Sequence, residues 1–278
     1  GTAQRMIERA GGLPLSLGCG DPRGLLQWMR RFEPNLVISS PTYMTTLTRA
    51  AEREGFKARL EQVLLGGEPL YAEQREYISA YWGAAVMNGY GATELGGAQT
   101  LTFTSGGGMA LNDFHLVTEI IDPQTGAAAD EGELVFTTLM REGMPLLRYR
   151  IGDRARWAQS DPGLPVRSIQ LLQRADDFII TADMGLYGQV IASALQALPG
   201  YGGKVAFHLS RVNLTDRMVM RLEGPALDPG QVRQLLADLY PELPGNVANG
   251  NLLLEIETGA DLGQQMKAYR IVDERKTE

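Results

Sequence analysis

The first hundred residues alternate between short apolar runs and longer segments whose apolar residues recur at helical spacing. The apolar runs lie in NLVISSPTYM (35–44), QVLLGGEP (62–69) and AAVMNGYG (84–91). Between them, YMTTLTRAAEREG and LYAEQREYISAYWG have the length and residue types of helices. Strands that alternate with helices of about 10 to 15 residues predict β-α-β units in a parallel sheet.

The ends of these runs are where a ligand site is expected. In open α/β sheets, ligands bind in the crevice at the carboxyl ends of the strands. Pro41, residues 66–69 and residues 89–94 each follow a predicted strand. We therefore expect three loops to converge on one site.

Beyond residue 100 the pattern changes. FHLVTEIIDPQTGAAADEGELVFTTL alternates apolar and polar positions around a Pro and Gly turn with no helix between, which predicts an antiparallel hairpin or small barrel. The last hundred residues predict a small α+β domain with antiparallel strands, with helices near 188–198 and 228–240 and strands near 204–212, 217–224 and 251–259. The boundary between the two parts is expected near Gln173–Asp177.

The predicted fold class is α/β, a parallel sheet of β-α-β units with a small β-barrel-like portion, followed by a smaller α+β domain. The expected divisions are a partial core domain at 1–172, made of an α/β sheet (1–100) and a β-rich portion (101–172), a short connection at 173–177, and a carboxyl-terminal domain at 178–278. A chain of 278 residues has room for a large and a small domain.

The charge balance, the cysteine count and the lack of a long apolar run argue against several classes of function. The chain has 26 Lys and Arg against 33 Asp and Glu, a net charge of -7, and no basic block interleaved with aromatics, so nucleic acid is not an expected partner. Its single cysteine, Cys19, cannot build a disulfide framework or a thiolate zinc site within one chain. The sequence has no apolar run of about 18 residues and no signal-peptide pattern at its start, which predicts a soluble cytoplasmic protein without a membrane partner.

The glycine-rich stretch VMNGYGATELGG (86–97) is the clearest candidate for chemistry. One interpretation is structural, a glycine turn followed by a helix cap at Thr93. The other is functional: exposed backbone amides and the Thr93 hydroxyl bind a phosphate, while Glu94 reaches a magnesium ion, a hard cation that prefers carboxylate oxygens. Tyr90 could then lie flat against a base.

NGYGATE resembles the signature of the adenylate-forming superfamily, which contains acyl-CoA synthetases, luciferases and the adenylation domains of peptide synthetases. GELVFTTLMREGMPLLRYRIGD (132–153) is similar to the corresponding segment of phenylacetate-CoA ligases and related aryl-acid-activating enzymes. LLGGEPLYAEQ (64–74) and FHLVTEIIDPQTG resemble two further family segments, so the resemblance covers nearly the whole chain.

The resemblance implies roles for residues that match the family motifs. It implies contacts to the base from Asn88 and Tyr90, and a position on the adenine side for Gly67, Glu68 and Pro69. It implies that Gly91 belongs to the nucleotide-binding loop, that Thr93 meets the α-phosphate, that Glu94 binds magnesium, and that Asp153 accepts hydrogen bonds from both ribose hydroxyls. The alternative for Asp153 is a turn residue after Gly152.

Three further assignments rest on the same resemblance. Arg174 in QRADD would contact ribose or phosphate, Asp176 would be the hinge about which the small domain rotates as a lid, and Lys267 in KAYRIVD would donate to the substrate carboxylate and the α-phosphate. Without the family, Arg174 and Asp176 would be a solvated charge cluster and Lys267 a surface group. Tyr43 matches a tyrosine near the acyl pocket, but a tyrosine on an amphipathic helix is as often part of a core.

Two departures from the family pattern matter. The Ser/Thr/Gly-rich loop that clamps the β- and γ-phosphates of ATP has no counterpart in these residues, which indicates either truncation or loss of ATP activation. After the hinge, DMGLYGQ carries Gly185 and Gly188 in place of the family's asparagine and proline, which casts doubt on CoA as the acceptor.

The expected function is ATP-dependent activation of a carboxylic acid, aryl in the first instance, to an acyl-adenylate with release of pyrophosphate. ATP or AMP and Mg²⁺ are the expected ligands, and CoA, a carrier protein or a reductase stays open as the acceptor. A homodimer also stays open. The alternative function is a non-catalytic AMP-binding module that has lost ATP turnover.

Overall fold

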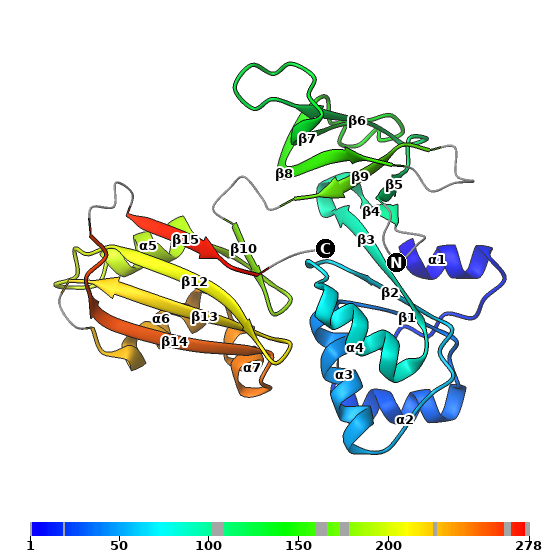
Figure 1. Ribbon diagram of the computed structural model, residues 1–278, viewed down its shortest axis with the longest axis horizontal. Helices are drawn as coiled ribbons and strands as arrows, with labels where there is room; N and C mark the ends of the chain where they lie inside the picture. The colour runs from blue at the N-terminus through cyan, green and yellow to red at the C-terminus, as the bar shows by residue number, and fades with distance from the viewer. Residues whose placement is uncertain are drawn as a thin grey trace. The chain divides into compact units, whose positions relative to one another are not determined.

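The computed structural model describes residues 2–18, 20–101, 108–159, 166–172, 178–224, 227–263 and 268–275. These residues divide into two compact units (Figure 1). The first contains Gly1–Leu70 and Gln74–Leu172, and the second contains Gln173–Glu278 together with Tyr71–Glu73.

The first unit begins with helices and parallel strands and continues with antiparallel strands. Its elements are α1 (Thr2–Arg9), α2 (Pro22–Phe32), β1 (Leu36–Ser39), α3 (Pro41–Arg53), β2 (Gln62–Gly66), α4 (Ala72–Trp82), β3 (Ala85–Ala92), the 3-10 helix η1 (Thr93–Leu95), β4 (Gly97–Leu101), β5 (Met109–Leu111), β6 (Leu116–Ile121), β7 (Glu131–Thr138), β8 (Tyr149–Ala158) and β9 (Ser168–Leu171). The predicted alternation of strands and helices before residue 100 is therefore present.

Local sequence explains where these helices begin. The Ser40 side chain accepts a hydrogen bond from the Tyr43 backbone amide at 3.3 Å, and Pro41 occupies the first helical position of α3. Asp21 and Pro22 start α2 in the same way. A short polar cap satisfies an amide that has no partner within the helix, and proline lacks an amide that would need one.

The nine strands of the first unit form one sheet in the order β1-β2-β3-β4-β5-β9-β8-β7-β6. The pairs β1–β2 and β2–β3 are parallel, and every later pair is antiparallel. The hairpin expected within 114–139 is β6–β7. The expected barrel is not a closed one, because within the described residues β6 is an edge strand that pairs with β7 alone.

Two apolar clusters fill the first unit. One packs α2, α3 and α4 onto β1–β3 and includes Leu26, Leu47, Leu65 and Ile78, all without exposed surface. The other lies among the antiparallel strands and includes Leu134, Phe136 and Ile169. The second cluster also receives Tyr90 from β3, so it joins the parallel part to the antiparallel part.

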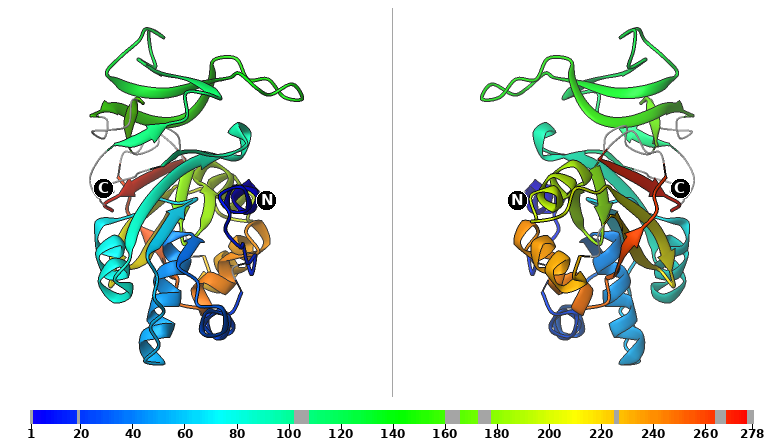
Figure 2. Two further views of the ribbon diagram at one scale, coloured as in Figure 1. Left: turned by 90° about the vertical axis from the view of Figure 1, so that its right-hand side faces the viewer. Right: turned by 90° about the vertical axis from the view of Figure 1, so that its left-hand side faces the viewer.

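The second unit is a mixed α/β layer. Its elements are β10 (Phe178–Thr181), β11 (Met184–Tyr187), α5 (Gly188–Gln196), β12 (Val205–Val212), β13 (Thr215–Glu223), α6 (Pro229–Leu239), α7 (Leu243–Ala248), β14 (Leu252–Ala260) and β15 (Tyr269–Asp273). Helices α5, α6 and α7 lie on one face of a four-stranded sheet, β14-β13-β12-β15 (Figures 1 and 2).

The pairing within this sheet differs from the antiparallel arrangement predicted for it. Only β12–β13 is antiparallel, whereas β13–β14 and β12–β15 are parallel. The chain passes through α6 and α7 between β13 and β14, and such a helical crossover returns the next strand in the same direction. The sequence pattern predicted α6 but neither α7 nor the parallel pairing that this crossover produces.

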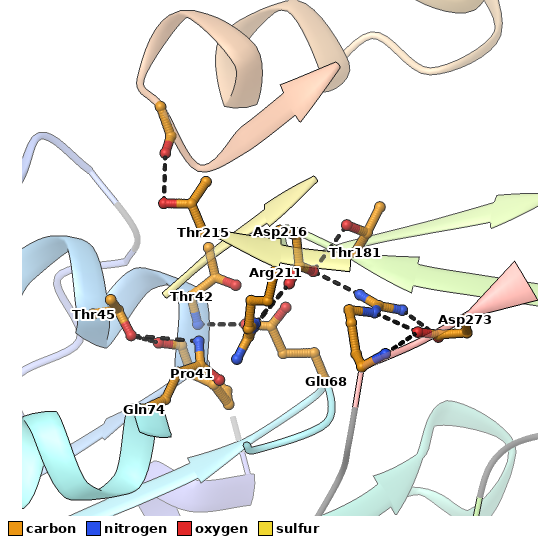
Figure 3. A network of polar contacts seen from close by, with 12 residues as sticks. Pro41, Thr42, Thr45, Glu68, Gln74, Thr181, Arg211, Thr215, Asp216 and Asp273 are labelled. Atoms are coloured by element: carbon orange, nitrogen blue, oxygen red, sulfur yellow. Dashed lines mark hydrogen bonds and ion pairs between the residues drawn. The ribbon is translucent and has the colours of Figure 1, made fainter. Parts of the chain in front are cut away.

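A buried ion cluster joins four parts of the second unit (Figure 3). The Asp216 carboxylate, 4% exposed, accepts hydrogen bonds from Thr181 at 2.9 Å, from Arg211 at 2.8 Å and from Arg275 at 2.7 Å. Arg275 also pairs with Asp273 of β15 at 2.7 Å. Burial alone would lower the pKa of the Arg275 guanidinium, but its bonds to Asp273 and the Asp216 charge outweigh burial and raise that pKa.

Asp216→Asn should destabilise the second unit by about 3 kcal/mol or more, because the buried Arg211 guanidinium loses its carboxylate partner and Arg275 keeps only Asp273. Hydrogen exchange of the β12 and β13 amides, combined with urea unfolding, measures the loss. Glu255→Gln is the matched control, since its pair with Arg217 is exposed and screened by solvent, so its loss should change stability little. Equal effects from the two variants would contradict a stabilising role for the cluster.

Candidate nucleotide site

The loops that follow β1, β2 and β3 lie side by side at one end of the parallel strands. Ser39 of β1 is level with Leu65 of β2, and Leu65 is level with Asn88 of β3. One step further, Gly66 pairs with Gly89. The first residues of α3, the Gly66–Pro69 loop and the NGYGATE segment therefore meet at a shared edge, as the strand pattern predicted.

Gly66 and Gly67 are glycines for two different reasons. A Cβ on Gly66 would lie 2.7 Å from the Gly89 carbonyl oxygen, which is closer than real Cβ contacts come. Gly67 has φ of +90°, a left-handed conformation that side chains disfavour. The tight passage from β2 into its loop therefore depends on both residues lacking a side chain.

Glu68, predicted to lie on the adenine side, binds the start of a helix. Its Oε1 accepts a hydrogen bond from the Thr42 backbone amide in the first turn of α3 (Figure 3). A carboxylate there satisfies an otherwise unpaired amide and interacts favourably with the helix dipole. Glu68 thus fixes the β2 loop against α3, and the half-buried Pro69 follows it directly.

Tyr90 and Asp153 come together from strands that are not neighbours in the sheet. The Tyr90 hydroxyl donates a hydrogen bond of 2.6 Å to Asp153 Oδ2. The Tyr90 ring stacks on Phe136 with a centroid distance of 6.5 Å and an interplanar angle of 28°. Because β4, β5 and β9 separate β3 from β8 in the strand order, the sheet must curl for this contact to form.

The backbone is tightly turned before Asp153 and after Glu94. Gly152, next to Asp153 in β8, has φ of +85°, and Gly96, which ends η1, has φ of +87°. Asp153 and Asn88 are both half-buried. The adjacent glycine turns therefore define the backbone near Asp153 and Glu94, and the half-buried side chains of Asp153 and Asn88 remain partly accessible to solvent.

In the Thr93–Glu94 turn the backbone is fixed by its contacts, whereas the two side chains are exposed to solvent. Thr93 and Glu94 are exposed, whereas Leu95 is buried in the cluster below them. Arg141, from the connection between β7 and β8, donates from its guanidinium to the Glu94 carbonyl oxygen. Sequence reasoning missed Arg141, because a single arginine in a loop between strands carries no local pattern that would point to this turn.

Tyr43 lies in the first turn of α3 and is half-buried. Its hydroxyl donates a hydrogen bond of 2.8 Å to the Gly20 carbonyl oxygen. This contact ties the segment before α2 to α3. Its predicted role beside an acyl group stays a prediction.

Three predicted residues lie outside the described part of the chain: Arg174, Asp176 and Lys267. The geometry described above covers the β2 loop, the end of β3, η1 and β8, all within the first unit. Within the described residues, no group of three or more His, Cys, Asp or Glu side chains could hold a metal ion. None of the described helices combines the length and apolarity needed to cross a bilayer.

A protein-family model described as AMP-binding enzyme matches residues 16–138. Phenylacetate-coenzyme A ligase of Pseudomonas putida is 28% identical over 284 residues, covering 96% of this chain and 64% of the relative. The enzyme of that name from Thermus thermophilus is 30% identical over 198 residues, covering 67% of this chain and 44% of the relative. The chain thus spans less than two thirds of the length of these relatives.

Among solved structures, a 2-hydroxyisobutyryl-CoA ligase in complex with 2-HIB-AMP and CoA matches with a TM-score of 0.72. It is 22% identical and covers 95% of this chain and 58% of that one. The chain belongs to the adenylate-forming, or AMP-binding, superfamily. Within it, distant homologues named phenylacetate-CoA ligase align with most of the chain.

Gly66→Ala should destabilise the first unit by about 1 to 3 kcal/mol, because a backbone carbonyl must shift to accept the added Cβ. Urea unfolding followed by tryptophan fluorescence provides the measurement. Gly24→Ala in α2 is the control, since no atom lies within 4 Å of its added Cβ and alanine favours a helix. A Gly66→Ala protein as stable as the control would show that the two strand ends are not held this closely.

Proposed function

We propose that this chain carries the nucleotide-binding part of an enzyme that activates a carboxylic acid, in the first instance an aryl acid, as an acyl-adenylate. The observation that carries the proposal is the Tyr90–Asp153 hydrogen bond, which brings the predicted base-contacting and ribose-contacting residues into one place. The named phenylacetate-CoA ligases support an aryl acid as the first substrate class to test.

In this proposal the nucleotide lies along the edge formed by the β2 loop, the end of β3 and β8. Asn88 and Tyr90 contact the base beside the loop of Gly67, Glu68 and Pro69, and Gly91 allows the backbone to approach. Asp153 accepts hydrogen bonds from the ribose hydroxyls, for which two carboxylate oxygens are suited. The Tyr90 hydroxyl orients the Asp153 carboxylate, because it donates a hydrogen bond to Oδ2.

The phosphates then reach the Thr93–Glu94 turn. The Thr93 hydroxyl donates to the α-phosphate, and the exposed Glu94 carboxylate supplies one oxygen ligand for magnesium. A single carboxylate fits that ion, which commonly takes most of its ligands from water and substrate phosphates. When bound, magnesium would neutralise part of the negative charge on the phosphates.

Activation requires the acid's carboxylate to attack the α-phosphorus in line, forming a carboxyl–phosphate bond as the bond to pyrophosphate breaks. The protein contributes position and charge, since the attacking group and the phosphate are both anionic. Lys267 donates to the carboxylate and α-phosphate, and Arg174 contacts ribose or phosphate. Asp176 is the hinge of a lid domain at 178–278 that delivers Lys267. Tyr43 packs against the acid.

The acceptor stays CoA, a carrier protein or a reductase. Gly185, which replaces the family asparagine, lies in β11, where an added Cβ would clash with the Phe178 ring. That ring packs on Tyr187 at 4.7 Å between centroids. The local packing of the β10–β11 hairpin thus accounts for the glycine, without reference to an acceptor.

Pyrophosphate exchange by the full-length gene product, with a panel of aryl and aliphatic acids, tests the proposal. Exchange that depends on one class of acid identifies the activity and the substrate class together. Measurable AMP binding without exchange for any acid would favour a non-catalytic nucleotide-binding module, and the absence of AMP binding would refute both.

Asp153→Asn should weaken AMP binding about tenfold or more, because an amide replaces the carboxylate that accepts from two ribose hydroxyls. Titration calorimetry gives the dissociation constants. Asp130→Asn is the control, an exposed carboxylate directly before β7. Unchanged AMP affinity in Asp153→Asn would exclude this residue from the ribose site.

Lys267→Ala should suppress adenylate formation while AMP binding persists, because the lysine acts on charge that builds up during the reaction. The comparison is between the exchange rate and the AMP dissociation constant of the same variant. Adenylation kinetics equal to those of the wild-type protein would rule out the role.

A further inference from the structure

The turn that bears Thr93 and Glu94 is held by a side chain from a distant part of the chain. Arg141 lies 47 residues beyond Glu94, in the connection between β7 and β8, and its Nη1 donates to the Glu94 carbonyl oxygen. The guanidinium also packs over the end of the turn, with its Cζ 3.8 Å from the position of a Cβ on Gly96. This distance corresponds to ordinary van der Waals contact, so the guanidinium lies directly against the end of the turn.

Arg141 binds the main chain of this turn and not the neighbouring carboxylate. Within the described residues, Arg141 and Glu94 form no ion pair, and the Glu94 side chain is exposed. A guanidinium that served only as a surface charge partner would be expected to neutralise that carboxylate. The observed arrangement instead leaves the Glu94 oxygens open while the peptide that carries them is fixed.

The guanidinium is also a concentrated source of positive charge. It has five N–H donors in a rigid fork, and in the described part of the chain the Glu94 carbonyl is its one hydrogen-bond acceptor. Arg141 is half-buried, so its side chain is not sealed from solvent. Phosphate oxygens are the acceptors that such a fork suits best.

We infer that Arg141 both positions the Thr93–Glu94 turn and donates directly to the phosphate end of the nucleotide. It holds the Thr93–Glu94 turn through the Glu94 carbonyl and adds positive charge beside it. This inference rests on the proposed function, and it makes a narrower claim: Arg141 favours nucleotides that carry phosphate and contributes nothing to recognition of the nucleoside.

Binding of AMP and of adenosine should therefore respond differently to substitution. Arg141→Gln should weaken AMP binding about tenfold or more, the loss expected for a charge-assisted contact, and leave adenosine binding within about twofold. Arg141→Lys should recover part of the AMP affinity, because the charge is retained while the fork is lost. Titration calorimetry with each probe measures both constants.

Arg148→Gln is the matched control, because Arg148 lies in the same connection, is exposed, and pairs with Glu119 at 3.2 Å. It should leave both constants unchanged. A merely structural role for Arg141 predicts equal losses of AMP and adenosine affinity together with a lower unfolding temperature, and that result would overturn the inference. So would unchanged AMP affinity in Arg141→Gln. If the wild-type protein bound neither probe, the proposed function itself would fail.

Discussion

The hydrogen bond between Tyr90 and Asp153 is the contact on which the geometry of the candidate site depends. It joins the end of the last parallel strand to an antiparallel strand that lies four places further along the sheet order. The bond can form only because the sheet curls, and the stacking of Tyr90 on Phe136 buries the inner side of that curl. A flat sheet of the same strands would leave the two side chains far apart.

Around this contact, backbone groups are fixed by other residues, whereas the side chains proposed to act on the ligand stay exposed. Backbone groups are held by packing and capping: Gly66 beside Gly89, Glu68 on the amide of Thr42, and Arg141 on the carbonyl of Glu94. The side chains of Thr93 and Glu94 remain exposed. Such an arrangement suits a reaction in which the protein mainly orients its substrates, because fixed donors and acceptors need no rearrangement when charge develops.

The second unit achieves rigidity by a different means. Its apolar core is covered on one face by helices α5, α6 and α7, and a buried cluster centred on Asp216 connects β10, β12, β13 and the chain after β15. In the proposed function this unit acts as a lid. A lid that must deliver one lysine gains from holding its own strands firmly, since looseness within it would misplace that residue.

The sequence alone determined the elements whose signals are local. Alternating apolar runs and helical spacing predicted β1–β3 with the helices between them, and the NGYGATE motif together with the segment at 132–153 identified the family. Tertiary structure alone decided the curl that brings Tyr90 to Asp153, the parallel pairing of β13 with β14, and the contact of Arg141 with Glu94. Each of these depends on residues tens of positions apart, and local preference carries no information about which distant partner a side chain will meet.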